Sequence, residues 1–80
     1  DAGEKARQCM KNVLAILEEG GLTADNIIKT TIFLTDINDF GAVNEVYASF
    51  FGDKYPARSC VEVSRLPKGV DVEIEAIAVY

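Results

Sequence analysis

The sequence predicts a single small α+β domain whose elements follow the order helix, strand, helix, strand, strand. Three observations predict this order: a helical apolar period over residues 2–19, a β-branched run over 27–35, and apolar/polar alternation over 57–65 and 70–80. A chain of 80 residues allows one domain, and 49% apolar with 26% charged residues is typical of globular proteins. We expect both helices on one face of the sheet.

The first helix is expected to run from Ala2 to Glu19. Its apolar side chains recur at the spacing of one helical face, at Ala6, Met10, Val13 and Leu17. Gly20 and Gly21 follow directly. Glycine ends helices because it adopts left-handed backbone angles at low cost, so the helix is expected to stop there.

The first strand is expected over Ile27–Thr35, where β-branched residues are concentrated. Apolar groups occur on both alternating sides of this segment, with Ile28, Ile32 and Leu34 on one side and Ile27 and Phe33 on the other. Two apolar sides are typical of a strand inside a sheet, so we expect this one to be covered on both faces.

The second helix is expected from Phe40 to near Gly52. Candidate caps precede it at residues 36–39, and Pro56 disfavours helical backbone at the residue before it. The apolar stripe of this helix consists of Phe40, Val43, Tyr47 and Phe50. Asn44 lies just outside the stripe, where it is either a solvent-facing amide or a polar group at the rim of a pocket.

The last two strands are expected to form an antiparallel hairpin through Leu66–Gly69, a loop of hairpin length. In that pairing Arg58 faces Ile77, Cys60 faces Glu75, and Glu62 faces Glu73. Two opposed glutamates repel each other, so the faces follow more directly from the alternation than the register does.

The predicted hairpin divides its side chains between the two faces of the sheet. One face is expected to include Arg58, Cys60, Glu73 and Glu75, and the helices are expected to cover the other, where Val61, Val63, Val72, Ile74 and Ala76 belong. The charged face also includes Ile77 and Val79, which indicates partial cover by another subunit. A chain this short buries a small core, which also favours a partner subunit.

A pocket for a small carboxylate is one interpretation of the charged face. The guanidinium of Arg58 is a planar fork of donors that matches a carboxylate, and glutamates beside it can transfer protons. An ordinary polar sheet face with ion pairs explains the same pattern, and the spacing alone favours that simpler interpretation. Cys60 is expected to be a structural thiol, because the chain has no histidine to activate it as a nucleophile.

Composition argues against several classes of function. The absence of histidine removes the usual zinc ligands and every histidine-based proton transfer. Thirteen acidic against eight scattered basic residues give a net charge of −5, which argues against binding nucleic acid. No apolar run approaches the roughly 20 residues of a membrane span. Cys9 and Cys60 form no CxxC pattern and are expected to be free thiols in a reducing, cytoplasmic compartment.

Several motifs resemble the Rid family of enamine/imine deaminases, also called the YjgF type. The matching segments run through nearly the whole chain in the family's order: Ile28–Leu34, Asn38–Phe40, Val43–Tyr47, Phe50–Phe51, Pro56–Val63, Leu66–Gly69 and Val72–Ala78. The strongest matches are Pro56–Val63, Leu66–Gly69 and the run from Val72 to Ala78.

The resemblance implies a chorismate-mutase-like fold with a mixed sheet, a homotrimer, and pockets at the clefts between subunits. It also implies hydrolysis of 2-aminoacrylate-type enamines and imines to 2-keto acids and ammonia, with no metal and no organic cofactor. By motif position, Arg58 would grip the carboxylate of a small-molecule substrate, and Glu73 would orient or activate the attacking water. Asn44 and Cys60 would line the pocket.

One part of the family pattern has no counterpart in this sequence. Family members begin with a further β-hairpin region that contains Gly-Pro-Tyr and Ser-Gly-Gln segments, and neither segment is present here. We therefore expect the N-terminal third of the family pattern, and the pocket tyrosine it contributes, to be missing from this chain. A non-catalytic module that binds 2-keto acids is the second hypothesis. RNA cleavage, a third idea attached to relatives of the family, is disfavoured by the acidic balance.

Overall fold

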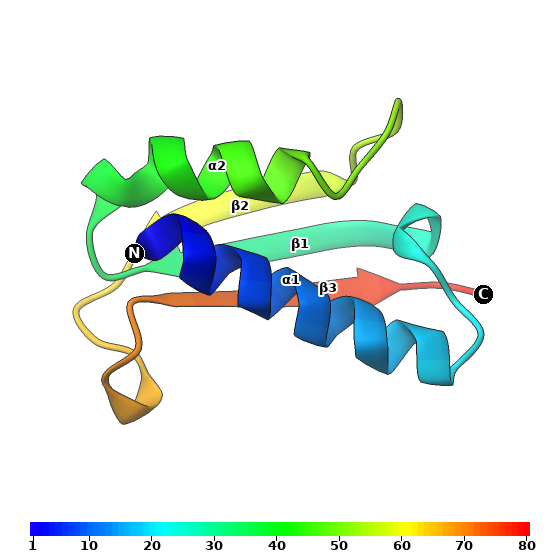
Figure 1. The fold of residues 1–80 in the computed structure, drawn as a ribbon, viewed down its shortest axis with the longest axis horizontal. Helices are drawn as coiled ribbons and strands as arrows, with labels where there is room; N and C mark the ends of the chain where they lie inside the picture. The colour runs from blue at the N-terminus through cyan, green and yellow to red at the C-terminus, as the bar shows by residue number, and fades with distance from the viewer.

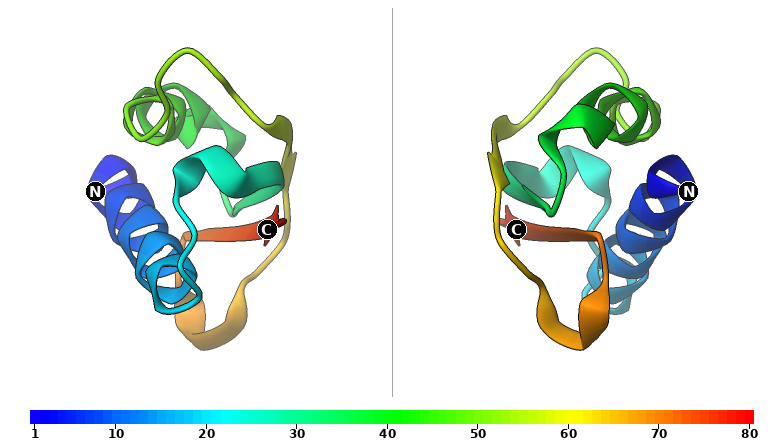
Figure 2. Two further views of the ribbon diagram at one scale, coloured as in Figure 1. Left: turned by 90° about the vertical axis from the view of Figure 1, so that its right-hand side faces the viewer. Right: turned by 90° about the vertical axis from the view of Figure 1, so that its left-hand side faces the viewer.

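Two α-helices and three β-strands follow one another in the predicted order. The computed structural model describes all 80 residues, Asp1–Tyr80. The elements are α1 (Ala2–Glu19), β1 (Ile27–Leu34), α2 (Phe40–Ala48), β2 (Ala57–Glu62) and β3 (Val72–Ala78) (Figure 1). Both helices lie on the same side of the sheet (Figure 2). The predicted α+β arrangement is therefore confirmed.

The bounds of α1 agree with the sequence prediction at both ends. The Asp1 carboxylate accepts a hydrogen bond from the backbone N–H of Glu4 at 2.8 Å, which satisfies one of the free donors at the helix N-terminus. Gly21 has a φ of +77°, a left-handed angle that glycine adopts without steric cost. The helix buries Ala6 and Met10 and packs against α2 and β3.

The sheet has the strand order β2-β1-β3, so the predicted hairpin between the last two strands is wrong. β2 pairs with β1 in parallel, and β3 pairs with β1 antiparallel. The sheet is therefore mixed, and β2 and β3 lie at its two edges. β1 has apolar residues on both of its alternating sides, and its central position lets it bond through both edges.

The connection from β2 to β3 crosses the end of β1 instead of folding back on itself. The N–H of Val63 donates to the carbonyl of Leu34 at 2.7 Å, and the N–H of Thr35 donates to the carbonyl of Asp71 at 3.1 Å. The two ends of the segment 63–71 are therefore bonded to the end of β1, one on each side of that strand. From the apolar/polar alternation, the two strands were predicted over residues 57–65 and 70–80, but β2 ends at Glu62 and β3 begins at Val72. The predicted connection was therefore shorter than the real one and had the length of a hairpin loop.

The observed register also changes which residues share a face. The side chains directed toward the helices are Thr30, Ile32 and Leu34 of β1, Arg58, Cys60 and Glu62 of β2, and Val72, Ile74 and Ala76 of β3. The other face, which we call the open face, includes Thr31, Phe33, Ser59, Val61, Glu73, Glu75 and Ile77. The prediction that Arg58 and Cys60 share a face with Glu73 and Glu75 is wrong, and so is the prediction that Val61 faces the helices. Val63 lies beyond the end of β2.

Two further details of the prediction need correction. A register shift between Ile27 and Lys29 turns Ile27 into the core, while Ile28 is 51% exposed. α2 ends at Ala48 and not near Gly52, and Phe51, rather than Phe50, is buried. The ring of Phe51 packs 5.0 Å from that of Tyr47, between centroids.

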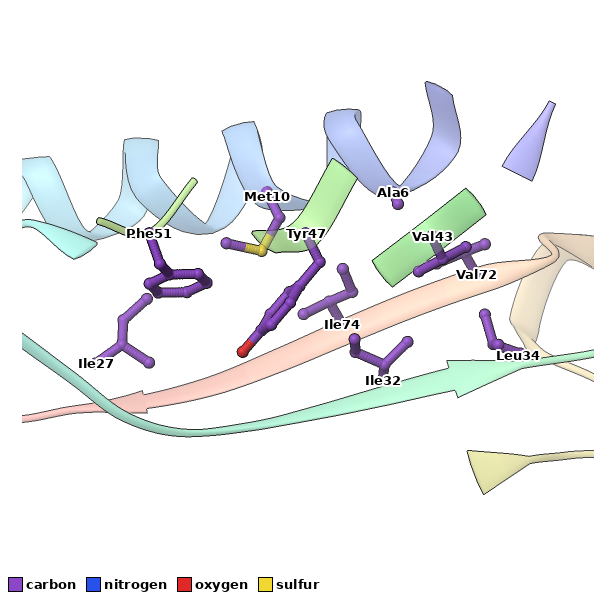
Figure 3. Packing of buried hydrophobic residues seen from close by; sticks show 10 residues of the cluster. All are labelled: Ala6, Met10, Ile27, Ile32, Leu34, Val43, Tyr47, Phe51, Val72 and Ile74. Carbon is purple, nitrogen blue, oxygen red and sulfur yellow. The ribbon is translucent and has the colours of Figure 1, made fainter. Parts of the chain in front are cut away.

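The core lies between the two helices and the sheet (Figure 3). Its buried apolar members are Ala6, Met10, Ile27, Ile32, Leu34, Val43, Tyr47, Phe51, Val72 and Ile74. Only one face of the sheet is covered in this way, so β1 is not covered on both faces by its own chain. The open face leaves Val61 at 41% and Ile77 at 58% exposure.

Candidate functional site

Arg58 lies on the edge strand β2, on the face directed toward the helices. Its guanidinium reaches α2, where Nη1 donates a hydrogen bond to Oδ1 of Asn44. The guanidinium carbon lies 5.1 Å from the ring centroid of Phe40 and 5.6 Å from that of Tyr47. Both distances are within the range of cation–π attraction.

The three partners of Arg58 come from successive turns of one helix. Phe40, Asn44 and Tyr47 are four and three residues apart, so they line the same side of α2. From the sequence, Asn44 is either a solvent-facing amide or a polar group at the rim of a pocket. In the structure it lines a hollow beside Arg58. Arg58 is thus brought close to Asn44, and it lines another hollow together with Cys60.

The positive charge of Arg58 has no carboxylate partner within the chain. The two ion pairs are elsewhere: the N-terminal amine with Glu4 at 3.8 Å, and Lys5 with Asp71 at 2.5 Å. A guanidinium has five N–H donors, and Asn44 accepts from one of them. The remaining donors are available to an anion, and a carboxylate is the anion that matches their planar geometry.

Two open hollows meet at Arg58. One has a volume of about 510 Å³ and is lined by Asn44, Tyr47, Ala48, Tyr55, Pro56 and Arg58. The other, of about 450 Å³, is lined by Ile37, Phe40, Arg58 and Cys60. Arg58 is the one residue that lines both hollows, so a small ligand in either lies beside its side chain.

Cys60 is half-buried and packs against the core from β2. Burial raises the pKa of its thiol, an effect that the positive charge of Arg58 partly offsets. The thiol is therefore protonated at neutral pH and is a weak nucleophile. This chemistry agrees with a residue that lines a pocket and argues against nucleophilic attack by Cys60.

Glu73 does not lie beside Arg58 within one chain. It pairs with Phe33 across β1 and β3 on the open face, whereas Arg58 pairs with Thr30 on the face covered by the helices. Glu73 and Glu75 are both exposed and form no ion pair. The sheet itself separates Arg58 from Glu73.

Sequence reasoning missed the contribution of the aromatic residues of α2 to the surroundings of Arg58. Phe40 and Tyr47 were assigned to the core stripe, and Tyr47 is indeed 2% exposed, but both rings also flank the guanidinium. It also missed Thr30, whose hydroxyl lies 2.7 Å from that of Tyr47 in the core. The helical spacing of Phe40, Asn44 and Tyr47 was the available signal.

Three further features of the chain concern metal ions, membranes and disulfides. No group of three or more Cys, Asp or Glu side chains is arranged to hold a metal ion. Neither helix has the length and apolar character needed to cross a membrane. Both cysteines are free thiols.

Comparison with known proteins gives consistent matches along the whole chain. A family model described as endoribonuclease L-PSP matches residues 1–80. A RutC family protein from Haemophilus influenzae is 58% identical over 83 residues, covering 99% of this chain and 64% of that protein. The 2-iminobutanoate/2-iminopropanoate deaminase of Escherichia coli K12 is 55% identical over 82 residues, with the same two coverages. The chain thus spans about 64% of the length of these relatives.

Solved structures match the fold equally well. The crystal structure of E. coli TdcF with bound serine superposes with a TM-score of 0.95 at 53% identity, covering 100% of this chain and 65% of that one. The E. coli YjgF gene product superposes with a TM-score of 0.94 at 54% identity, covering 99% of this chain and 65% of that one. The strand order found here therefore agrees with experimentally determined folds.

Proposed function

The chain belongs to the endoribonuclease L-PSP family, and from that premise we propose that the whole protein hydrolyses 2-aminoacrylate-type enamines and imines to 2-keto acids and ammonia. One observation in the structure carries the proposal: the Arg58 guanidinium is held by Asn44, lies at two hollows and has no carboxylate partner. Relatives that are 55% identical are named 2-iminobutanoate/2-iminopropanoate deaminases. A relative that is 53% identical binds serine, which has a carboxylate.

The proposed chemistry is the addition of water to a carbon–nitrogen double bond. The enamine first isomerises to the imine by moving a proton to carbon. Water then adds to the imine carbon, and the carbon–nitrogen bond of the resulting carbinolamine breaks to release ammonia and the 2-keto acid. Arg58 holds the carboxylate in place throughout, and Glu73 takes and returns the proton of the attacking water.

We propose that one pocket uses Arg58 of one subunit and Glu73 of another. The two residues lie on opposite faces of the same sheet, so Glu73 of the same chain cannot serve Arg58. The open face exposes Val61 and Ile77 beside Glu73, which favours cover by a second copy. A homotrimer with pockets between subunits meets both requirements.

Substitution of Arg58 and Glu73 tests these roles in the whole protein. Arg58→Ala is expected to reduce turnover of 2-aminoacrylate by orders of magnitude, measured in an assay coupled to a 2-keto acid dehydrogenase. Arg65→Ala is the matched control, because the Arg65 side chain is exposed and forms no hydrogen bond or ion pair. If Arg58→Ala hydrolyses the substrate at the parental rate, the role of Arg58 as carboxylate anchor is wrong.

The alternative is a non-catalytic module that binds 2-keto acids through the same arginine. Glu73→Gln separates the two functions, because a binding module does not need the proton transfer. A variant that binds 2-ketobutyrate but has lost turnover supports the enzyme. Equal binding with no turnover in either form supports the module, and Glu75→Gln is the control on the same face.

Endoribonuclease activity, which the family description names, is less compatible with this chain. The net charge is −5, and the eight basic residues are scattered along the sequence. Ribonuclease activity that copurifies with the protein and persists in an Arg58→Ala/Glu73→Gln variant would indicate a contaminant.

The two free thiols support a location for the proposed enzyme. Neither Cys9 nor Cys60 forms a disulfide. Free cysteines persist in reducing compartments, so we place the protein in the cytoplasm. Labelling of both thiols in unfolded protein taken directly from cells tests this placement.

A further inference from the structure

Tyr47 connects the buried core to the candidate site. Its side chain is 2% exposed, and its hydroxyl lies 2.7 Å from the hydroxyl of Thr30. Thr30 is itself 1% exposed and is the one buried polar residue of the chain. Figure 3 shows the Tyr47 hydroxyl directed away from α2 toward the sheet. This hydrogen bond is a polar link inside an apolar core, where a hydroxyl without a partner is costly.

The position of Thr30 places this hydrogen bond directly beside Arg58. Thr30 of β1 and Arg58 of β2 are register partners on the same face of the sheet. A tyrosine anchored at Thr30 therefore presents its ring next to the arginine side chain. The resulting distance from the ring centroid to the guanidinium carbon is 5.6 Å, with Phe40 at 5.1 Å and Asn44 as hydrogen-bond acceptor.

We propose that Thr30 and Tyr47 are positioning residues, which fix the direction of the Arg58 guanidinium through the Tyr47 ring. Arg58 extends from an edge strand to an exposed hollow, and a long side chain there has many rotamers. A ring held at both ends limits those rotamers: the backbone of α2 holds one end, and Thr30 holds the other. The inference rests on the proposed function only in taking Arg58 as the residue that binds a carboxylate.

The test compares a carboxylate ligand with its neutral amide in the whole protein. Calorimetry measures the dissociation constants of 2-ketobutyrate and of 2-oxobutanamide for the parent, Tyr47→Phe and Thr30→Val. Each variant is expected to bind 2-ketobutyrate about tenfold more weakly, with unchanged affinity for the amide. The double variant is expected to lose no more than either single variant, because all three remove the same hydrogen bond. Parental affinity for the carboxylate in both single variants overturns the proposal.

Two variants separate positioning from a general loss of stability. Thr30→Ser keeps the hydroxyl and is expected to retain the parental affinity for 2-ketobutyrate; a loss as large as that of Thr30→Val overturns the proposal. Leu34→Val removes a methylene from the same core farther along β1. It is expected to lower the Tm without changing the affinity for either ligand. A carboxylate-specific loss in Leu34→Val would show that any core change weakens the site.

Steady-state kinetics give an independent readout that also separates this inference from the proposed function. Tyr47→Phe leaves the guanidinium in place and only frees its rotamers, and the cost of ordering that side chain is met when the substrate binds. Tyr47→Phe should therefore raise KM about tenfold and leave kcat within about twofold. If the parent protein binds 2-ketobutyrate but hydrolyses no 2-aminoacrylate, the proposed function fails and the calorimetric test still decides the inference. If the parent is active and Tyr47→Phe has the same KM, the inference alone fails.

Discussion

Ile77 provides a direct test of the proposed assembly. It lies on the open face of β3, is 58% exposed, and follows Glu73 and Glu75 on the same side of the strand. If a second copy covers this face, shortening or charging the side chain weakens association without removing any contact within the core. We therefore expect Ile77→Ala to weaken the trimer, and Ile77→Asp to weaken it further.

The expected loss follows from the exposed part of the side chain. Full burial of an isoleucine stabilises by about 1.5–3 kcal/mol. With 58% of the residue still exposed in the single chain, burial at an interface contributes about 1–2 kcal/mol per copy. Three copies together contribute about 3–6 kcal/mol, which lowers the trimer association constant by roughly 10²- to 10⁴-fold in Ile77→Ala. Ile77→Asp adds the cost of covering a carboxylate that has no partner.

Sedimentation velocity of the whole protein over a dilution series measures this effect. Ile16→Asp is the matched control, because Ile16 is 73% exposed and lies on α1, away from the open face of the sheet. The control is expected to sediment like the parent at every concentration. A parental distribution for Ile77→Asp at the lowest concentration, or equal dissociation of Ile16→Asp, would refute the assignment of the open face as the interface.

Two further predictions concern single side chains. Cys60→Ser is expected to keep turnover within a few-fold of the parent, because burial raises the pKa of this thiol and leaves it protonated; loss of activity as complete as in Arg58→Ala would contradict this. Lys5, by hydrogen bonding and by its charge, lowers the pKa of Asp71 below its ordinary value of 3.8. The pair therefore stabilises the fold fully above pH 3.8, and this contribution is lost as the pH falls through the lowered pKa. The Tm difference between the parent and Lys5→Met should therefore be constant from pH 5 to pH 7 and shrink as the pH falls below 3.8. A difference that stays constant below that pH would contradict it.

The helices and strand positions were predictable because their signals are local. Asp1 and Gly21 mark the ends of α1 through cap and backbone chemistry that depends on neighbouring residues alone. Strand pairing depends on residues distant in the chain, and the alternation in residues 57–65 and 70–80 is equally compatible with a hairpin and with two strands that flank a third. The apolar character of β1 was the signal that favoured the second arrangement.

The candidate site was predictable residue by residue but not as an arrangement. Arg58 and Asn44 meet as a pocket interpretation requires, because a long side chain on β2 can reach one side of α2. The prediction that Arg58 and Glu73 share a face was wrong because it assumed that β2 pairs with β3. The alternation within each strand was predicted correctly, but both strands pair with β1, and this places the two residues on opposite faces. The role of Thr30 has no local signal, since it depends on the packing of α2 against β1.

The alternation of β3 links assembly to the proposed chemistry. Val72 and Ile74 face the core, while Glu73 and Ile77 face outward, so the outward residues can change without disturbing the core. If Glu73 serves the Arg58 of another copy, dissociation separates the base from the carboxylate anchor while each chain keeps its fold. Specific activity of Ile77→Ala is therefore expected to fall on dilution in step with the loss of trimer, while the far-UV circular dichroism per residue stays constant. Activity that remains proportional to protein concentration after the trimer has dissociated would place both residues of a working site within one chain, which the register of this sheet forbids.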